Sequence, residues 1–242
     1  TRHRRNVDEG NAEGKHPFVG FVLEALMIQS VLSEEEAMLR ATVREFADQI
    51  LVPNAAHYDN KGEFPWNNVR GLADLGIFGL TVDEEYGGSG GTTRQLVLVA
   101  EEIARGCGST SLIFVAHLSL CTQFIANYGT DTQKRRWIPT LTTAEAIGAF
   151  ALTEQGSGSD AAAMRTTVAV DENGYILNGS KLFTTNALEA NVFVVLATHD
   201  HDLHARGISA LVVERDTKGF TINPQHGKMG MRATSTAELV FE

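Results

Sequence analysis

Hydrophobic positions along this 242-residue chain change their spacing near residue 146. Before it, apolar residues recur every three or four positions, which is typical of amphipathic helices. After it, short β-branched runs are separated by Gly and Asn, which is typical of strands. We therefore predict an α+β multidomain chain: a tail and lead-in over 1–31, an all-α helical domain over 32–145, and a small antiparallel β-barrel or sandwich domain over 146–242.

The first predicted helix begins at Ser33, which forms a capping-box pattern with Glu36. One buried stripe is expected along it, and Pro53 is expected to close or kink it. The stripe consists of Met38, Leu39, Val43, Phe46, Ala47 and Ile50. Further helices are predicted over 66–75, 92–105, 109–128 and 130–141, with a loop over 83–91.

Eight strands are predicted in the second part, and the first of them is the apolar run 147–152. Asp171–Gly174 has the composition of a hairpin turn. The other predicted strands are 166–170, 175–177, 181–184, 192–197, 208–213, 220–222 and 238–241.

The segment IGAFALTEQGSGSD over 147–160 is a strand that runs into a glycine- and hydroxyl-rich turn. Glycine permits positive φ and close approach of a ligand, and successive backbone N–H groups can bind a phosphate. Thr153 lies where the strand becomes the turn, so its hydroxyl can face a ligand over the strand end. Local composition alone favours a flexible connector, and only a second segment downstream favours the ligand-binding interpretation instead.

The segment GSKLFTTNA over 179–187 repeats this theme. Phe183 precedes Thr185 by two positions, so strand alternation places both side chains on one face. An aromatic ring beside a hydroxyl can pack on a flat heterocycle and bond its edge. Together with the turn at 156–160, this pattern predicts a ligand that carries both a flat ring and a pyrophosphate; taken alone, Phe183 is a core aromatic.

Charge and cysteine content exclude several classes of partner. The 30 acidic and 20 basic residues give a net charge of −10, which argues against nucleic acid or an anionic membrane surface. No apolar run is expected to reach the ~20 residues of a membrane span. Cys107 and Cys121 have no metal-ligand spacing and are expected to be buried thiols.

Several separated motifs resemble the flavin-dependent acyl-CoA dehydrogenase family, most closely its short-chain (butyryl-CoA type) and branched short-chain members. They occur in the family's order over about 32–242, which makes the resemblance far more specific than one motif. The motifs are DEEYGGSGG (83–91), GTDTQKRRWIP (129–139), FALTEQGSGSD (150–160), NGSKLFTTNA (178–187) and KMGMRATSTAELVFE (228–242).

The resemblance implies FAD as cofactor and assigns positions to it. Thr153 would bond the pyrimidine end of the flavin, Ser159 would contact both the pyrophosphate and acyl-CoA, and Thr185 would lie near flavin N5. Phe183 stands where many relatives have Trp. The implied FAD-binding residues are Phe150, Ala151, Leu152, Thr153, Gly158, Ser159, Phe183, Thr184 and Thr185.

The implied reaction is FAD-dependent α,β-dehydrogenation of a short-chain acyl-CoA to the trans-2-enoyl-CoA, with electrons leaving through an electron-transfer flavoprotein. A homotetramer in the mitochondrial matrix or the bacterial cytoplasm is also implied. In the family, a C-terminal four-helix bundle carries the catalytic glutamate, so the resemblance names no catalytic residue among these 242. A truncated or non-catalytic flavin- or acyl-CoA-binding subunit and an acyl-CoA oxidase are the alternatives.

Other groupings have simpler interpretations. His199, His201 and His204 with neighbouring Asp residues are interpreted as a solvated turn rather than a metal site. His117, Ser119 and Asp160 suggest a hydrolase, but the chain has no GxSxG motif. Lys134–Arg136 is interpreted as a solvated helix face, and Glu101 and Glu102 with Arg105 as helix-surface ion pairs.

Overall fold

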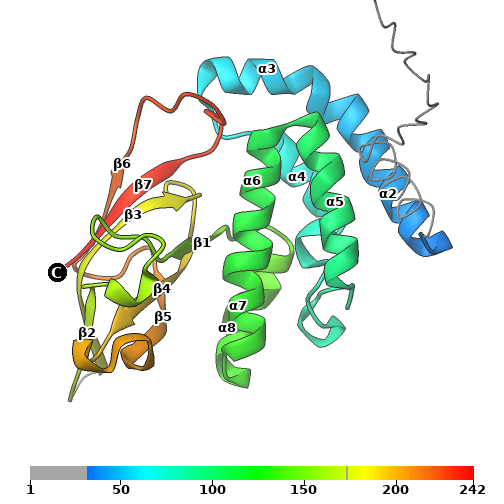
Figure 1. Ribbon diagram of the computed structural model, residues 1–242. Coiled ribbons are helices and arrows are strands. Elements are labelled where there is room, and N and C mark those ends of the chain that lie inside the picture. The colour runs from blue at the N-terminus through cyan, green and yellow to red at the C-terminus, as the bar shows by residue number, and fades with distance from the viewer. Residues whose placement is uncertain (1–31, 173) are drawn as a thin grey trace, which may run out of the picture. The chain divides into compact units, whose positions relative to one another are not determined.

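The computed structural model describes residues 32–172 and 174–242, so the predicted tail and lead-in over 1–31 lie outside the described residues. The chain divides into two compact units, one ending at Met38 and one spanning Leu39–Glu242. Helices precede the strands in chain order, which confirms the predicted α+β organisation (Figure 1).

All five predicted helical segments are present, and α5 and α6 lie side by side (Figure 1). At the predicted start of the first, the Ser33 Oγ accepts the Glu36 N–H at 3.1 Å and the Ser33 N–H donates to Glu36 Oε2 at 2.9 Å. The α-helices are α2 Glu34–Phe46, α3 Val52–Lys61, α4 Trp66–Asp74, α5 Thr93–Gly106, α6 Gly108–Val115, α7 Gln123–Tyr128 and α8 Asp131–Thr142. The π- and 3₁₀-helices are η1 Ala47–Leu51, η2 Ile77–Gly79, η3 Glu84–Tyr86, η4 Ala116–Thr122, η5 Ala161–Ala163 and η6 His201–Gly207.

Pro53 does not end the first helix, contrary to expectation. Helix α2 passes through the π-helical turn η1 into α3, with Pro53 in the first turn of α3, where its missing N–H is tolerated. The extra residue in the π-helical turn shifts the apolar stripe from residue 47 onwards, so it bears on Ile50 but not on Met38, which lies before the turn. Val43 and Ala47 are fully buried, whereas Met38 and Ile50 are exposed, so the predicted stripe is wrong at these two positions.

Helices α6, η4 and α7 form one continuous helix, Gly108–Tyr128, which begins one residue before the predicted range. Its most apolar 18-residue window has a mean hydropathy of 1.4, so by length and composition alone the helix could cross a membrane, which the expectation about apolar runs did not anticipate. Within the described part of the chain, it is the one helix that is long and apolar enough to be a candidate membrane span. Because 61% of its most apolar window is buried in the protein, the helix is weak evidence for a membrane span.

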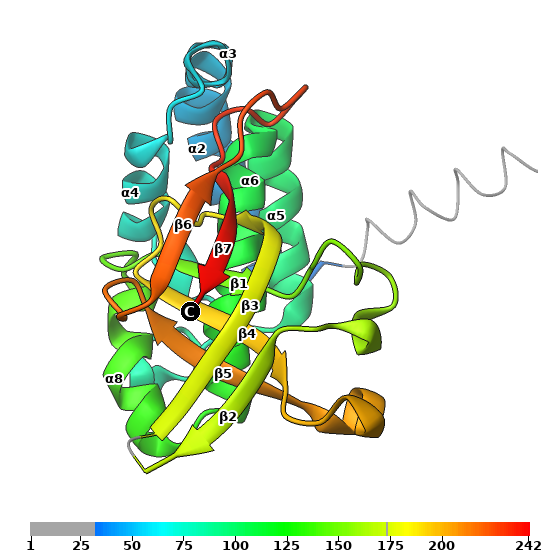
Figure 2. The same cartoon turned by 90° about the vertical axis from the view of Figure 1, so that its left-hand side faces the viewer.

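Seven strands follow, joined in the order β1–β4–β2–β3–β7–β6, with β5 paired along the opposite edge of β4. Figure 2 shows β3 crossing in front of β4 and β5, so the sheet curls over itself. The predicted antiparallel sheet is in fact mixed, because β1 and the end of β2 pair in parallel with β4. The strands are β1 Gly148–Ala151, β2 Thr167–Asp171, β3 Gly174–Thr185, β4 Val192–Thr198, β5 Ile208–Glu214, β6 Phe220–Pro224 and β7 Thr236–Phe241.

The two strands predicted over 175–177 and 181–184 are one strand, β3. Gly179 lies in its middle with φ +142, and a Cβ there would stand 2.7 Å from Thr166 Cα. This glycine therefore permits a close approach of two chain segments instead of ending the strand. At the predicted hairpin, Asp171 pairs with Gly174, while Asn173 lies outside the described residues.

Buried side chains of the helical and β parts meet around η4 and β1. His117 of η4 is fully buried, and its Nε2–H donates to the Leu141 carbonyl at 2.9 Å. Its Nδ1 accepts the Gly148 N–H at 3.0 Å, which requires a neutral ring. The imidazole thus ties the start of β1 to the end of α8.

Candidate functional site

The two threonine-bearing segments lie beside each other, because the Leu182 N–H of β3 donates to the Thr153 carbonyl at 2.7 Å. The Asn186 amide, just past β3, donates to the Gly148 carbonyl of β1 at 3.3 Å and to the Ile113 carbonyl at 3.1 Å. Asn186 adopts a left-handed φ of +66, which Asn tolerates better than most residues. These contacts hold the end of β3 alongside β1 and the turn that follows it, at one edge of the β part.

The glycine- and serine-rich segment after β1 is a tight turn, so the flexible-connector interpretation is wrong. The backbones of Glu154 and Ser157 exchange hydrogen bonds at 2.9 and 3.2 Å, and the Ser157 hydroxyl donates to the Asp160 carbonyl at 2.9 Å. Gly156 and Gly158 do not have the expected positive φ, and a Cβ at either would meet nothing within 4 Å. Nothing inside the described protein therefore requires glycine at these two exposed positions.

A buried ion pair lies under this turn, and the sequence analysis missed it. Lys181 Nζ of β3, fully buried, donates to Glu154 Oε1 at 2.7 Å and to the Leu152 carbonyl at 3.1 Å. The Glu154 carboxylate also accepts the Arg165 N–H at 2.6 Å and the Thr166 N–H at 3.0 Å. A lysine at an inward-facing strand position is the signal that identifies such a pair in a sequence.

Burial and hydrogen bonding act in opposite directions on this pair. Burial alone would raise the pKa of Glu154, but the hydrogen bonds from Lys181, Arg165 and Thr166 together hold it below its usual value. Burial lowers the pKa of Lys181, and Glu154 opposes this shift. The ammonium group and the carboxylate lie 2.7 Å apart, so the turn rests on a closed, hydrogen-bonded ion pair.

Strand β3 ends in a bulge that separates its side chains by exposure. The register shifts between Lys181 and Thr184, and Phe183 within the bulge has a left-handed φ of +57. Because of this bulge, the simple alternation of faces that was assumed for Phe183 and Thr185 does not apply here. Phe183 is nevertheless 65% exposed, and Thr185 is half-buried. Thr184 between them is enclosed, and its Oγ1 has no hydrogen-bond partner in the described part of the protein.

The remaining residues that the resemblance assigns to FAD lie on β1 and its turn. Phe150 is half-buried, with its ring centroid 5.7 Å from that of Phe124. Ala151 is fully buried, Leu152 is half-buried, and Ser159 is exposed. The structure therefore brings one exposed ring, two half-buried threonines and one open glycine turn to the same edge. Such a set fits a ligand with a flat polar-edged ring and a phosphate.

The hydrolase alternative has no geometric support. Both ring nitrogens of His117 bond backbone groups, and the Ser119 hydroxyl donates to the Val115 carbonyl at 2.6 Å within its own helix. Neither side chain is available to the other.

The histidines at 199–204 belong to a turn built by Asp200. The Asp200 Oδ1 accepts the Asp202 N–H at 2.9 Å, which makes Asp200 the N-cap of η6. Across residues 32–172 and 174–242, no group of three or more His, Cys, Asp or Glu residues is placed to hold a metal ion. Cys107 and Cys121 are buried free thiols as expected, and burial raises the pKa of Cys121 to about 12.

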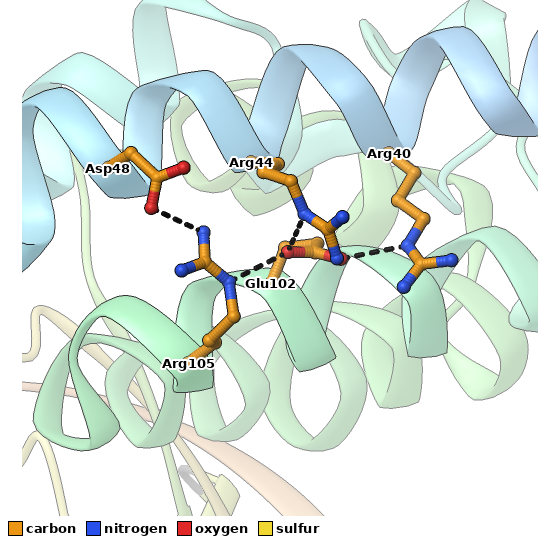
Figure 3. A network of polar contacts seen from close by, with 5 residues as sticks. All are labelled: Arg40, Arg44, Asp48, Glu102 and Arg105. Carbon is orange, nitrogen blue, oxygen red and sulfur yellow. Dashed lines mark hydrogen bonds and ion pairs between the residues drawn. The ribbon is translucent and has the colours of Figure 1, made fainter.

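Glu102 is not part of a helix-surface ion pair, contrary to the prediction. It is 1% exposed and accepts hydrogen bonds from three arginines, two of which come from α2 (Figure 3). Arg44 binds both carboxylate oxygens, at 2.6 and 2.9 Å, and Arg105 continues to Asp48 at 2.7 Å. Helical periodicity around Glu102 predicts its pair with Arg105, three residues away, but not its pairs with Arg40 and Arg44, which lie 62 and 58 residues away.

In the basic run on α8, Arg135 and Arg136 are exposed as predicted, whereas Lys134 is half-buried, and the two arginines also make contacts. Arg135 pairs with Glu85 at 3.3 Å, and Arg136 pairs with Glu214 at 2.8 Å. The Trp137 Nε1–H also donates to Glu214 at 2.8 Å. Glu214 ends β5, so these contacts join α8 to the β part.

Two curated relatives are similar to this chain over most of its length. The short-chain specific acyl-CoA dehydrogenase of Clostridium acetobutylicum is 40% identical over 211 residues, which cover 87% of this chain and 56% of that protein. The mitochondrial short-chain specific acyl-CoA dehydrogenase of Bos taurus is 43% identical over 215 residues, which cover 88% and 52%. The chain thus spans about half the length of these relatives.

A solved structure shares the fold. The glutaryl-CoA dehydrogenase of Mycobacterium smegmatis in complex with FADH2 superposes with a TM-score of 0.81 at 34% identity, over 87% of this chain and 53% of that one. The family model for the acyl-CoA dehydrogenase N-terminal domain matches residues 33–145, and the model for the middle domain matches residues 149–242. With both domain models matched in order, the chain belongs to the acyl-CoA dehydrogenase family.

Proposed function

We propose that this chain binds FAD and a short-chain acyl-CoA as part of an acyl-CoA dehydrogenase that forms the trans-2-enoyl-CoA. The hydrogen bond from the Leu182 N–H to the Thr153 carbonyl carries the proposal, because it joins the two threonine-bearing segments at one edge. The names of the short-chain relatives support the substrate class, and the FADH2 complex of a relative supports the cofactor.

Residues at this edge divide between the two ends of FAD. Phe183 would cover the flavin ring, and the hydroxyls of Thr153 and Thr185 would bond its polar edge. Phe150, Ala151, Leu152 and Thr184 would support the ring from the strands beneath it. Gly158 and Ser159 would bind the pyrophosphate through backbone N–H groups and the Ser hydroxyl.

Substrate would approach from the turn, where the exposed Ser159 also contacts acyl-CoA. Bound FAD supplies an acceptor for the β-hydrogen and its electron pair, which leaves the α-proton to a base. Glu154 does not fill that role, because Lys181 and two backbone N–H groups bond its carboxylate. The resemblance places the base, a glutamate, in the C-terminal bundle of the family.

The wider setting follows from the same resemblance. Electrons would pass to an electron-transfer flavoprotein, and the whole enzyme would be a homotetramer with an N-terminal helical domain over 32–145 and a middle domain over 146–242. One relative is named mitochondrial and another is bacterial, so both the mitochondrial matrix and the bacterial cytoplasm agree with the comparisons.

A binding titration tests the proposal directly. We expect the purified chain to bind FAD in a one-to-one ratio and to quench its fluorescence, and we expect butyryl-CoA to perturb the bound flavin spectrum more than palmitoyl-CoA does. A chain that stays colourless in excess FAD, and whose tryptophan fluorescence no acyl-CoA changes, contradicts the proposal. Peroxide formation in air by the whole enzyme would instead identify the oxidase variant.

Gly158→Ala should weaken FAD binding at least 10-fold without changing the melting temperature of the free chain. A Cβ at this position has no protein neighbour within 4 Å and needs no left-handed φ, so only an approaching ligand would meet it. Gly230→Ala, which shares both properties but lies in the β6–β7 loop, is the matched control and should bind FAD normally. Equal affinity of both variants would remove Gly158 from the site.

A further inference from the structure

We infer that Lys181 is the positioning residue of the flavin edge: its buried ammonium group fixes the turn after β1 to β3 and so sets the position of Thr153. This inference rests on the proposed function, since it gives a purpose to a buried cation that contacts neither solvent nor the exposed edge.

The contacts of Lys181 surround Thr153 in the sequence. Nζ donates to the carbonyl of Leu152, which precedes Thr153, and to the carboxylate of Glu154, which follows it. The next residue of β3, Leu182, donates its N–H to the carbonyl of Thr153 itself. Three consecutive residues of the turn are therefore bonded to two consecutive residues of β3.

Glu154 extends the same anchor to the next segment of chain. Its carboxylate accepts the N–H groups of Arg165 and Thr166, and the Thr166 hydroxyl donates to the Ser180 carbonyl at 3.2 Å. Both ends of the glycine-rich turn are thus bonded to β3 through one lysine–glutamate pair. The turn itself, with Gly156, Gly158 and Ser159 exposed, has no other side-chain anchor in the described structure apart from Ser157.

A buried charge pair is a poor way to gain stability, because desolvation of both ions offsets most of their attraction. Apolar residues of the same volume would hold the sheet together equally well. What the pair adds is direction, since an ammonium group must point its donors at fixed acceptors. The geometry therefore indicates that the pair fixes the backbone around Thr153 rather than the fold as a whole.

Lys181→Met, which keeps the aliphatic length and removes the donors, tests this inference. Amide hydrogen exchange in the free chain should accelerate at least 10-fold at Leu182, Arg165 and Thr166, while the β4–β5 ladder stays as protected as in the wild type. FAD affinity should fall at least 10-fold, and the visible circular dichroism of bound flavin should change.

Glu102→Gln is the matched control, because it disrupts another buried ion pair of the same chain far from this edge in the sequence. The melting temperature of this variant should fall. Its FAD affinity should stay within threefold of the wild type, and the circular dichroism of its bound flavin should not change. If both variants lose FAD in proportion to their melting temperatures, or if exchange at Leu182 is unchanged in Lys181→Met, the positioning role is wrong.

Glu154→Gln provides a milder variant if Lys181→Met does not fold. Its amide nitrogen cannot accept a hydrogen bond, so with the amide oxygen in the Oε1 position that Lys181 and the Thr166 N–H share, the Arg165 N–H loses its acceptor. Exchange should accelerate at Arg165 and less at Thr166 and Leu182, and FAD affinity should fall about threefold. If the wild type binds no FAD, the proposed function fails, and the exchange pattern alone still decides whether Lys181 positions the turn.

Discussion

Glu102→Gln is expected to lower the free energy of unfolding by about 3–5 kcal/mol, which is typical of removing one partner from a buried ion pair. The carboxylate is the common acceptor for Arg40, Arg44 and Arg105, so the neutral amide leaves three guanidinium groups crowded together (Figure 3). Asp48 would then be the remaining carboxylate of the network drawn there. The hydrogen bonds that would be lost join α2 to α5, so the substitution should weaken the helical part first.

Chemical denaturation of the variant and wild type at neutral pH measures this loss. Glu101→Gln is the matched control, because Glu101 is the preceding residue of α5 and is exposed. The control should stay within about 0.5 kcal/mol of the wild type, as surface substitutions generally do. If the Glu102→Gln variant is as stable as the control, the three arginines become solvated without loss of folding free energy, and the prediction is wrong.

Acid should act on this network only at low pH. Burial alone would raise the pKa of Glu102, but hydrogen bonds from Arg44, Arg40 and Arg105 outweigh it and lower the pKa to about 2 from an ordinary 4.5. A carboxyl with a lowered folded-state pKa contributes stability above its unfolded value and loses it as the pH falls. The contribution of Glu102 is therefore complete above about pH 4.5 and disappears towards pH 2.

Local sequence patterns were sufficient for most of the secondary structure but not for its junctions. Period and capping residues predict five helical segments, because helix formation depends on neighbours three or four positions away. They do not predict α3 beyond Pro53 or the 3₁₀-helix η3 inside the predicted loop over 83–91. Proline often ends a helix, but Pro53 lies in the first turn of α3 and the helix continues through it. Glycine often separates two strands, but Gly179 lies inside β3 and permits a close approach to Thr166. Which of the two roles applies depends on residues distant in the sequence, such as Thr166 for Gly179.

The candidate site shows the same limit. Motifs locate Thr153, Phe183 and Thr185, since each is marked by residues beside it. The pair of Lys181 with Glu154 joins residues 27 positions apart, and the bulge at Phe183 depends on the pairing of β3 with β7. Resemblance to a family proposes which residues would face a ligand, whereas the groups that hold those residues in place become visible only in the fold.

Protonation of His117 should account for the main loss of stability between about pH 6.5 and pH 4. Burial lowers the pKa of this imidazole to about 4, although its bond to the Leu141 carbonyl opposes the shift. A histidine whose folded-state pKa is lowered stabilises the protein above its unfolded value of 6.5 and loses that contribution as the pH falls. The difference corresponds to about 3 kcal/mol.

The physical reason is that a protonated ring has two donors. Nδ1 would then point an N–H at the N–H of Gly148, which it accepts in the neutral form, and β1 would lose its tie to α8.

His117→Gln separates this effect from general acid denaturation. The variant should be less stable than the wild type at neutral pH, and its stability should fall by about 3 kcal/mol less between pH 6.5 and pH 4. His57→Gln, at an exposed position of α3, should keep the full pH dependence of the wild type. Because Glu102 loses its contribution only below about pH 4.5, the two buried groups act in successive windows, and the His117→Gln variant alone should show a stability that is nearly flat from pH 6.5 down to about pH 4.5. If His117→Gln keeps the wild-type slope, other groups cause the acid response and β1 is held to α8 without the imidazole.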